Sequence, residues 1–329
     1  MPNPTESSQN TPAPDGPTPS ASVPASAPVP ASADARALTA GVAMLTTVVA
    51  VISLLVGGLM TAVSLTGHVF GAWPSPEPLS QGLVGAAMLG TSPALFTVGR
   101  ARLWQEVRTL VYPMAIVLVG LFTVSLLDAR HLYIAEGGSI ILVLFSLGWM
   151  FTLGVLTVSA LILLAWQHLT PSGQPAGART APLPNWSKPP LAVLGSSWLG
   201  IGTGLLVRPG FWSGFVPWDL DRLDAQALGV WALALGVGVL GALAEDDLER
   251  TRAALLALPF TGAALTLVLA FRAAGVDWSS GSAMSLVAMV AGLLVTGASG
   301  WLLLSRLSGG TRAAAAGVAV AHGTPRSPN

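Results

Sequence analysis

The chain contains no cysteine among its 329 residues. Without a thiol there is no disulfide, no Cys-ligated zinc, no iron–sulfur cluster and no thiol nucleophile. Charge is almost as scarce, because only 9% of the residues are Asp, Glu, Lys or Arg, against roughly 25% in soluble globular chains. The 15 basic and 15 acidic residues cancel, so no net field attracts nucleic acid. These deficits exclude a soluble enzyme of ordinary surface chemistry and a nucleic-acid-binding protein.

Apolar residues, in contrast, make up 52% of the chain. A helix that crosses ~30 Å of hydrocarbon needs about 20 apolar residues. Charge-free apolar runs of this order recur at 38–66, 80–99, 109–127, 138–167, 189–207, 225–244, 253–271 and 282–304. In lipid, backbone groups must bond within their own segment, so these runs predict helices. The predicted fold is an all-α integral membrane protein with eight transmembrane helices.

The weakest of these runs is 80–99, which contains Pro93, Ser92 and, in its interior, the glycines Gly82, Gly85 and Gly90. If this segment re-enters the membrane without crossing it, seven spans remain. The distribution of basic residues favours eight spans, because eleven of the 15 then fall on one side. These eleven are Arg36, Arg100, Arg102, Arg108, Arg179, Lys188, Arg250, Arg252, Arg306, Arg312 and Arg326. The positive-inside rule places this side, with both termini, in the cytoplasm.

Composition divides the chain into five parts. Residues 1–36 are rich in Pro, Ser and Ala and predict a disordered cytoplasmic tail. Two four-helix membrane units follow, at 37–167 and 191–305, joined by a Pro- and Gly-rich cytoplasmic linker at 168–190. Residues 306–329 predict a mobile cytoplasmic tail. Fourteen arginines against a single lysine, with much Ala, Gly and Pro, are typical of a GC-rich bacterial genome and suggest a bacterial inner membrane.

The two membrane units resemble each other when the chain is shifted by 145 residues. Trp73 then meets Trp218, Gln81 meets Gln226, and Pro113 meets Pro259 after one residue of slippage. Upstream, the pair Gly58-Leu59 meets Gly204-Leu205. Four spans per unit is an even number, so both units insert with the same orientation. This predicts two parallel four-helix repeats related by an axis along the membrane normal.

The segment from Phe215 to Leu223, followed by a Gly/Ala-rich helix that ends in Glu245-Asp246-Asp247, carries a family resemblance. It is similar to uncharacterised multi-pass membrane proteins of GC-rich bacteria that have a Trp-Pro-Trp-type outer loop. Residues 189–304 resemble them best, and this chain has Val216 where the pattern has its first Trp. The family has no established activity, so the resemblance implies a class of protein and no function.

The outer loop between the fifth and sixth predicted spans is the densest polar feature on its side. Tryptophans at this depth serve as interface anchors, and Arg and Asp can simply pair with each other. A sharper interpretation is an outer-face recognition site for a cationic or polyhydroxylated ligand, with aromatic rings as platforms. Its candidate residues are Arg208, Trp212, Trp218, Asp219, Asp221, Arg222 and Asp224.

Two cytoplasmic loops carry opposite charge. Residues 100–108 hold three arginines and one glutamate, a sum of +2, whereas residues 245–252 hold four acids and two arginines, a sum of −2. We expect these loops to meet and to fix the register of the two units. A small-residue stripe formed by Ser196, Gly200 and Gly204 predicts close helix packing on one face of the fifth span.

No chemistry of an enzyme is apparent in the predicted spans. They contain no titratable side chain at mid-depth, and the four histidines lie at span edges or in the tail. We therefore expect no catalytic residue, no cofactor and no metal site. Two functions remain open: a non-enzymatic scaffold or envelope-associated protein in the lipid bilayer, or a passive carrier or binder of a small solute or lipid. A polar cavity between the units would favour transport, and a closed, dry seam would favour scaffolding.

Overall fold

The computed structural model describes residues 36–171 and 181–322, with side chains as far as Arg306. Within these residues the chain is helical and contains no strand; Ala37 and Leu103 form one isolated antiparallel bridge. The predicted all-α class is confirmed. The long helices are α1 (Ala40–Ile52), α2 (Gly58–Leu65), α3 (Pro78–Val98), α4 (Arg108–Leu127), α6 (Ile140–Leu169), α7 (Lys188–Val207), α9 (Arg222–Glu245), α10 (Arg252–Phe271) and α11 (Gly281–His322).

Seven helical segments of the described chain are long and apolar enough to cross a membrane, as expected of a multi-pass membrane protein. They cover 40–65, 108–127, 140–169, 185–207, 222–245, 252–271 and 281–306. The first of them unites α1 and α2 through a π-helical turn, η1 (Ser53–Gly57).

Helix α3 occupies the place of the weakest predicted span. It is one uninterrupted helix of 21 residues, although it contains Pro93. It is not among the seven apolar segments, because Gly, Ser and Gln take positions that apolar residues fill elsewhere. Sixteen of its residues are buried inside the protein. Protein neighbours, more than lipid, therefore surround this helix.

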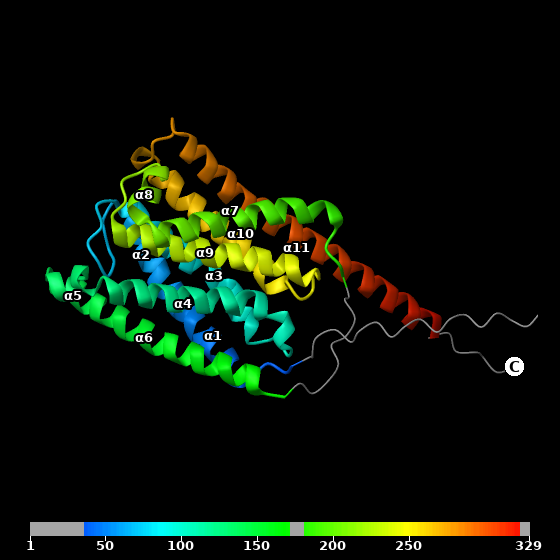
Figure 1. Cartoon of the computed structure of the whole chain (residues 1–329). Coiled ribbons are helices and arrows are strands. Elements are labelled where there is room, and N and C mark those ends of the chain that lie inside the picture. Colours follow the sequence, from blue (N-terminus) through cyan, green and yellow to red (C-terminus); the bar gives the residue numbers. More distant parts are fainter. Residues whose placement is uncertain (1–35, 172–180, 323–329) are drawn as a thin grey trace, which may run out of the picture.

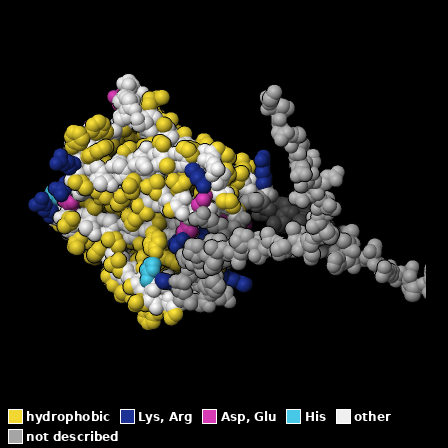
Figure 2. Space-filling view, turned by 45° about the vertical axis from the view of Figure 1, so that its right-hand side comes forward, with side chains coloured by type: hydrophobic (Ala, Val, Ile, Leu, Met, Phe, Trp, Pro, Cys, Tyr) yellow, Lys and Arg dark blue, Asp and Glu magenta, His cyan; other side chains and the backbone are white. Residues whose placement is uncertain are grey.

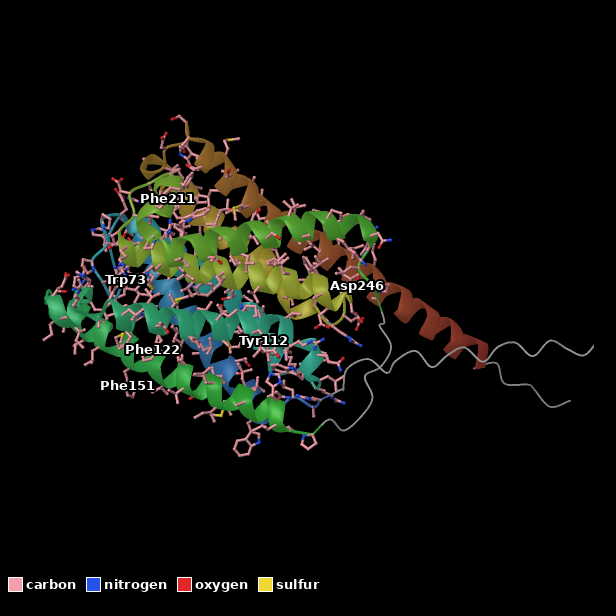
Figure 3. All side chains as sticks on the ribbon, in the orientation of Figure 1. Trp73, Tyr112, Phe122, Phe151, Phe211 and Asp246 are labelled. Carbon is pink, nitrogen blue, oxygen red and sulfur yellow. The ribbon has the colours of Figure 1, made fainter. Side chains whose placement is uncertain are left out.

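The connections gather at two ends of the bundle (Figure 1). At one, here named the Trp73 end, lie residues 66–77, 128–139, 208–221 and 272–280; at the other, the Arg108 end, lie residues 99–107, 181–187 and 246–251. Both ends of the described chain lie at the Arg108 end. Figure 3 shows Trp73 and Phe211 at one end and Tyr112 and Asp246 at the other.

The connections contain short helical turns. At the Trp73 end these are η3 (Ala129–His131), α5 (Tyr133–Glu136), α8 (Pro209–Trp212), η5 (Ser213–Phe215) and η6 (Ala273–Gly275); at the Arg108 end they are η2 (Trp104–Glu106) and η4 (Asn185–Ser187). Two backbone hydrogen bonds tie the Trp73-end loops together in pairs. Tyr133 N donates to Ala72 O, and Asp277 N donates to Pro217 O.

The helices of the two predicted units interlock. Within the first unit α1 and α2 pack along α3, and α4 packs on α6; within the second α7 packs along α9, and α10 packs on α11. Across the units α3 lies along α10 and α4 lies along α9. The second helix of each unit thus packs on the third helix of the other, and the two units share one core.

Glycines allow the closest helix approaches. A Cβ on Gly57 would lie 2.7 Å from the carbonyl oxygen of Gly85, and a Cβ on Gly202 would lie 2.8 Å from that of Gly229. The expected stripe on α7 is wrong in its face, because Gly200 has open space beside it. Gly202, which lies on a different face of α7 from Ser196 and Gly200, makes the close contact with α9 instead.

Apolar side chains cover the flank of the bundle, and most charged groups lie toward its two ends (Figure 2). Helix α11 continues to His322, beyond the predicted end of the last span at residue 304. Residues 1–35 of the predicted tail at 1–36, residues 172–180 in the middle of the linker and residues 323–329 lie outside the described residues.

Candidate functional site

A cavity of ≈ 450 Å³ lies inside the bundle, between the two units. Its walls come from α1 with η1, α3, α4 and α6 of the first unit and from α7, α9 and α10 of the second, with Leu183 and Thr251 of the connections at the Arg108 end. Met88 and Leu95 of α3, Met114 of α4 and Trp231 of α9 are among the wall residues. This volume lies in the range typical of sites for small molecules, roughly 300–1,000 Å³.

The cavity wall is apolar. No charged side chain lines it within the described chain, and its polar side chains are hydroxyls and indoles: Ser53, Thr91, Thr109, Thr152, Thr251, Trp149 and Trp231. Several are already satisfied: Thr91 Oγ1 donates to Ala87 O at 2.9 Å, and Trp149 Nε1 donates to Ser125 Oγ at 3.2 Å. Of the lining side chains, Thr109 Oγ1 and Trp231 Nε1 have no hydrogen-bond partner among the described residues, and these two neutral groups would replace only a small part of the hydration that a charged or highly polar ligand loses. The wall therefore suits an apolar molecule.

The cavity is elongated along the helix axes. On α4 its lining runs from Thr109 to Leu121, a rise of about 18 Å over twelve residues. One leaflet contributes about 15 Å of hydrocarbon to a bilayer. The cavity is therefore about as long as the hydrocarbon of one leaflet.

The π-helical turn forms part of the cavity wall. Ser53 and Val56 of η1 line the cavity together with Val49 and Ile52 of α1. A π turn adds a residue to the helix and widens it locally, and such turns are frequent at functional sites. The corresponding helix of the second unit, α7, is regular over its 20 residues.

The predicted outer-loop residues lie at the Trp73 end, and three of them, Trp218, Arg222 and Asp224, contact the other unit. Asp224 is buried in the first turn of α9, where it accepts hydrogen bonds from Trp73 Nε1 at 2.9 Å and from the Ser75 hydroxyl. Trp218 Nε1 donates to Ser80 Oγ at 2.9 Å. Each loop tryptophan therefore bonds to the third residue of a helix in the opposite unit.

The other predicted residues have separate environments. Trp212 packs on Gly204 and on the rings of Phe211 and Phe215. Asp221 caps α9 by accepting from Asp224 N at 2.6 Å, and Arg222 Nε lies 3.8 Å from Asp128 Oδ1. Arg208 and Asp219 make no side-chain hydrogen bond or ion pair among the described residues.

A second pocket, of ≈ 490 Å³, lies between the end of α7, α8 and the start of α9. It brings together two of the seven predicted residues, Asp221 and Arg222, and adds Ser213 and Gln226. Burial raises the pKa of Asp221, although the backbone N–H of Asp224 opposes this shift. Most of the predicted set therefore stabilises the loops and the seam between the units, and only a part of it faces open space.

At the Arg108 end the two oppositely charged loops meet, as the sequence predicts. Arg108 Nε pairs with Glu245 Oε1 across the units. Asp246 pairs with Lys188 at 2.9 Å, and Asp247 pairs with Arg250 at 3.4 Å. The first of these pairs joins the two units, and the other two hold the end of the second unit together.

Sequence reasoning missed the cavity and the partners of the two aligned tryptophans. The alignment of Trp73 with Trp218 is the signal that could have suggested equivalent roles. The three histidines whose side chains the structure describes take polar partners at the helix ends: His168 lies near Arg36 and Tyr112, His131 lies 3.2 Å from Glu136, and His68 lies 3.1 Å from the Thr66 hydroxyl. In the described part of the chain no group of three His, Cys, Asp or Glu residues could hold a metal ion.

No family model, no curated protein sequence and no solved structure matches this chain.

Proposed function

We propose that the protein is a non-catalytic membrane protein that binds an apolar, membrane-soluble molecule in the cavity between its two units. The single observation that carries this proposal is the elongated cavity of ≈ 450 Å³ with a wall free of charged side chains. The cavity in the seam between the units is not polar, as a carrier of polar solutes requires, and the seam is not closed, as a pure scaffold would have it. An apolar ligand fits both its volume and its chemistry.

The proposed architecture is eight spans in two parallel four-helix repeats, with α3 as the eighth span. Equivalent contacts support it: Trp73 and Trp218 each bond to a helix start in the opposite unit. The close approaches at Gly57 and Gly202 are also equivalent, at an offset of 145 residues. The glycines that occupy equivalent places in the two units are therefore Gly57 and Gly202, where the sequence alignment had paired Gly58 with Gly204. We further propose a bacterial inner membrane with the arginine-rich Arg108 end in the cytoplasm.

Native mass spectrometry of the full chain released from lipid nanodiscs tests the proposal. We expect a stoichiometric apolar adduct on the wild type. Thr152→Phe, which projects a ring from the cavity wall, should lose it. Thr203→Phe is the matched control, because Thr203 is exposed on α7 and lines no part of the cavity.

A bare wild-type polypeptide, or an adduct that survives Thr152→Phe unchanged, would overturn binding in the cavity. A chain bound only to another protein would favour the scaffold function instead.

A further inference from the structure

We propose that the cavity opens sideways to the lipid, between α1 with η1 and α6, and takes up an uncharged lipid directly from the membrane. This inference rests on the proposed function, because it names the class of molecule bound and the route by which that molecule enters. Its basis is the distribution of exposed residues around the cavity wall and the difference between the two units at equivalent helix pairs.

The opening is located by two wall residues of α6 that are also on the surface. The side chain of Leu144 is 60% exposed, and Gly148, one turn further along, is exposed with no atom within 4 Å of a Cβ built on it. On the first helix, the half-buried residues Ile52 and Val56 line the same cavity. A residue that is on the lipid-facing surface and on the cavity wall marks a passage between the two.

The opening has a boundary at each end. Toward the Arg108 end, α1 and α6 are in contact: Leu163 fills the space beside Gly41, and Thr39 N donates to Gln167 Oε1 at 2.9 Å. Toward the Trp73 end, Phe70 of the loop after α2 packs on Phe145, a wall residue beside Leu144 at the rim of the opening, with their ring centroids 4.6 Å apart. The space between these boundaries lies along the hydrocarbon-facing flank of the bundle and away from its polar ends.

The opening lies at the depth of the π turn. Gly148 is eight residues into α6 from the Trp73 end, about 12 Å along the axis, and Leu55 at the centre of η1 is ten residues from the end of α2, about 15 Å. Both positions are close to the middle of a ~30 Å hydrocarbon layer. The local widening of the first helix thus coincides with the opening.

The corresponding helix pair of the second unit is closed. There α11 meets α7, and a Cβ on Gly292 would lie 2.7 Å from the Leu194 side chain. Gly148 has no such neighbour. The two units therefore differ where a symmetric pair of openings would be expected, and the first unit alone provides the passage.

The ligand is uncharged because its whole path is apolar. Neither the opening nor the cavity wall offers a charged side chain in the described chain, and an ionised headgroup at mid-depth in the membrane is strongly disfavoured without a partner. A neutral lipid can place its hydrocarbon along the 18 Å lining, a length of about twelve helical residues, while no charge has to be neutralised.

The absence of cysteine permits a reversible block of the opening. Gly148→Cys is labelled with benzyl methanethiosulfonate, with complete labelling verified by intact mass, and the full chain is reconstituted in nanodiscs. Gly200→Cys is the matched control, because Gly200 is also an exposed helical glycine with open space but lies away from the cavity. The probe is a diacylglycerol with a diazirine in one acyl chain, and its phosphatidic acid analogue has the same chains.

We expect the diacylglycerol probe to cross-link to wall peptides containing Met88 and Met114, and the phosphatidic acid probe to label them far less. Labelling Gly148→Cys before loading should abolish the cross-link, and reduction should restore it. Labelling after loading should leave the cross-link intact, which separates a blocked passage from a filled cavity. The Gly200→Cys label should have no effect in either order. Leu144→Trp, a second obstruction of the same opening, should slow loading if Gly148→Cys does not fold.

The outcomes separate the two proposals. If the wild type gives no cross-link at the cavity wall, the proposed function itself fails. If the wall is cross-linked but the label on Gly148→Cys does not prevent loading, binding stands and the lateral route is overturned. If phosphatidic acid labels the wall as strongly as diacylglycerol, the restriction to uncharged lipids is overturned.

Discussion

The ion pair between Arg108 and Glu245 should respond asymmetrically to the loss of one partner. Glu245 is the more buried, with 7% of its side chain exposed against 31% for Arg108. Arg108→Gln leaves a carboxylate in the seam without its partner, and we expect a loss of about 3 kcal/mol in the free energy of unfolding. Glu245→Gln leaves a guanidinium that still reaches water, so we expect a loss of only about 1 kcal/mol.

The double variant R108Q/E245Q should lose less than the sum of the two single variants, because no unpaired charge remains in the seam. A coupling of about 1–2 kcal/mol is expected for groups in direct contact. Exchanging the two residues, R108E/E245R, should likewise recover stability relative to either single reversal. The measurement is a double-mutant cycle on the full chain, unfolded by SDS titration in mixed micelles.

Two results would refute this reasoning. If Glu245→Gln lowers the free energy of unfolding as much as Arg108→Gln does, the burial of the remaining charged side chain does not determine the loss of stability. If the single losses simply add in the double variant, the two loops are not coupled across the units. The pair formed by Lys188 and Asp246, which lies within the second unit, provides a comparison that does not bridge the seam.

Three further perturbations test the packing and the loops. Gly202→Ala should destabilise the protein by about 2 kcal/mol, because its Cβ would lie 2.3 Å from the α9 backbone. Gly200→Ala, which has open space beside it, should be neutral or should stabilise the protein by up to about 1 kcal/mol. Equal thermal stabilities of the two variants would contradict this expectation. Asp224→Ala leaves an indole N–H and a hydroxyl of the other unit without their acceptor and should cost about 3 kcal/mol, against about 1 kcal/mol for Ser80→Ala, in the same SDS titration. Because burial raises the pKa of Asp221, ionising this group costs stability. That cost is absent below the ordinary Asp pKa of about 4 and complete above the raised one. Asp221→Asn, which keeps the helix cap, should therefore gain stability relative to wild type as the pH rises from about 4, and a pH-independent difference would count against it.

Long apolar runs made the helices predictable. The predicted runs at 109–127 and 253–271 match α4 (Arg108–Leu127) and α10 (Arg252–Phe271) within one residue, because charged residues bound them on both sides. Helix α3 was the hardest case, since its glycines and polar residues lower its apolar character. These residues are present because other helices cover α3. A helix that is buried inside a membrane protein needs small residues for close packing more than it needs apolar residues for contact with lipid.

The cavity and most of the seam were not predictable from a single sequence. The order of residues does not show which glycine faces a neighbour and which faces lipid, so the stripe through Gly200 was placed on the wrong side of α7. The wall of the cavity consists of ordinary Leu, Val, Met and Thr residues, which look the same whether they fill space or surround it. Charge complementarity was a stronger signal: it predicted that the loops 100–108 and 245–252 meet, although not that Arg108 and Glu245 form the contact.

The interlocked packing of α3 with α10 has a consequence for biosynthesis. The last residue of α3 precedes the first residue of α10, Arg252, by about 150 residues, so at the usual translation rates its main partner follows roughly 10–30 s later. During that interval α3 exposes glycines and polar side chains that lipid does not solvate well. The membrane insertion machinery must hold this helix, or admit it late, until the second unit is made. The order of helix insertion is therefore expected to differ from the order of synthesis.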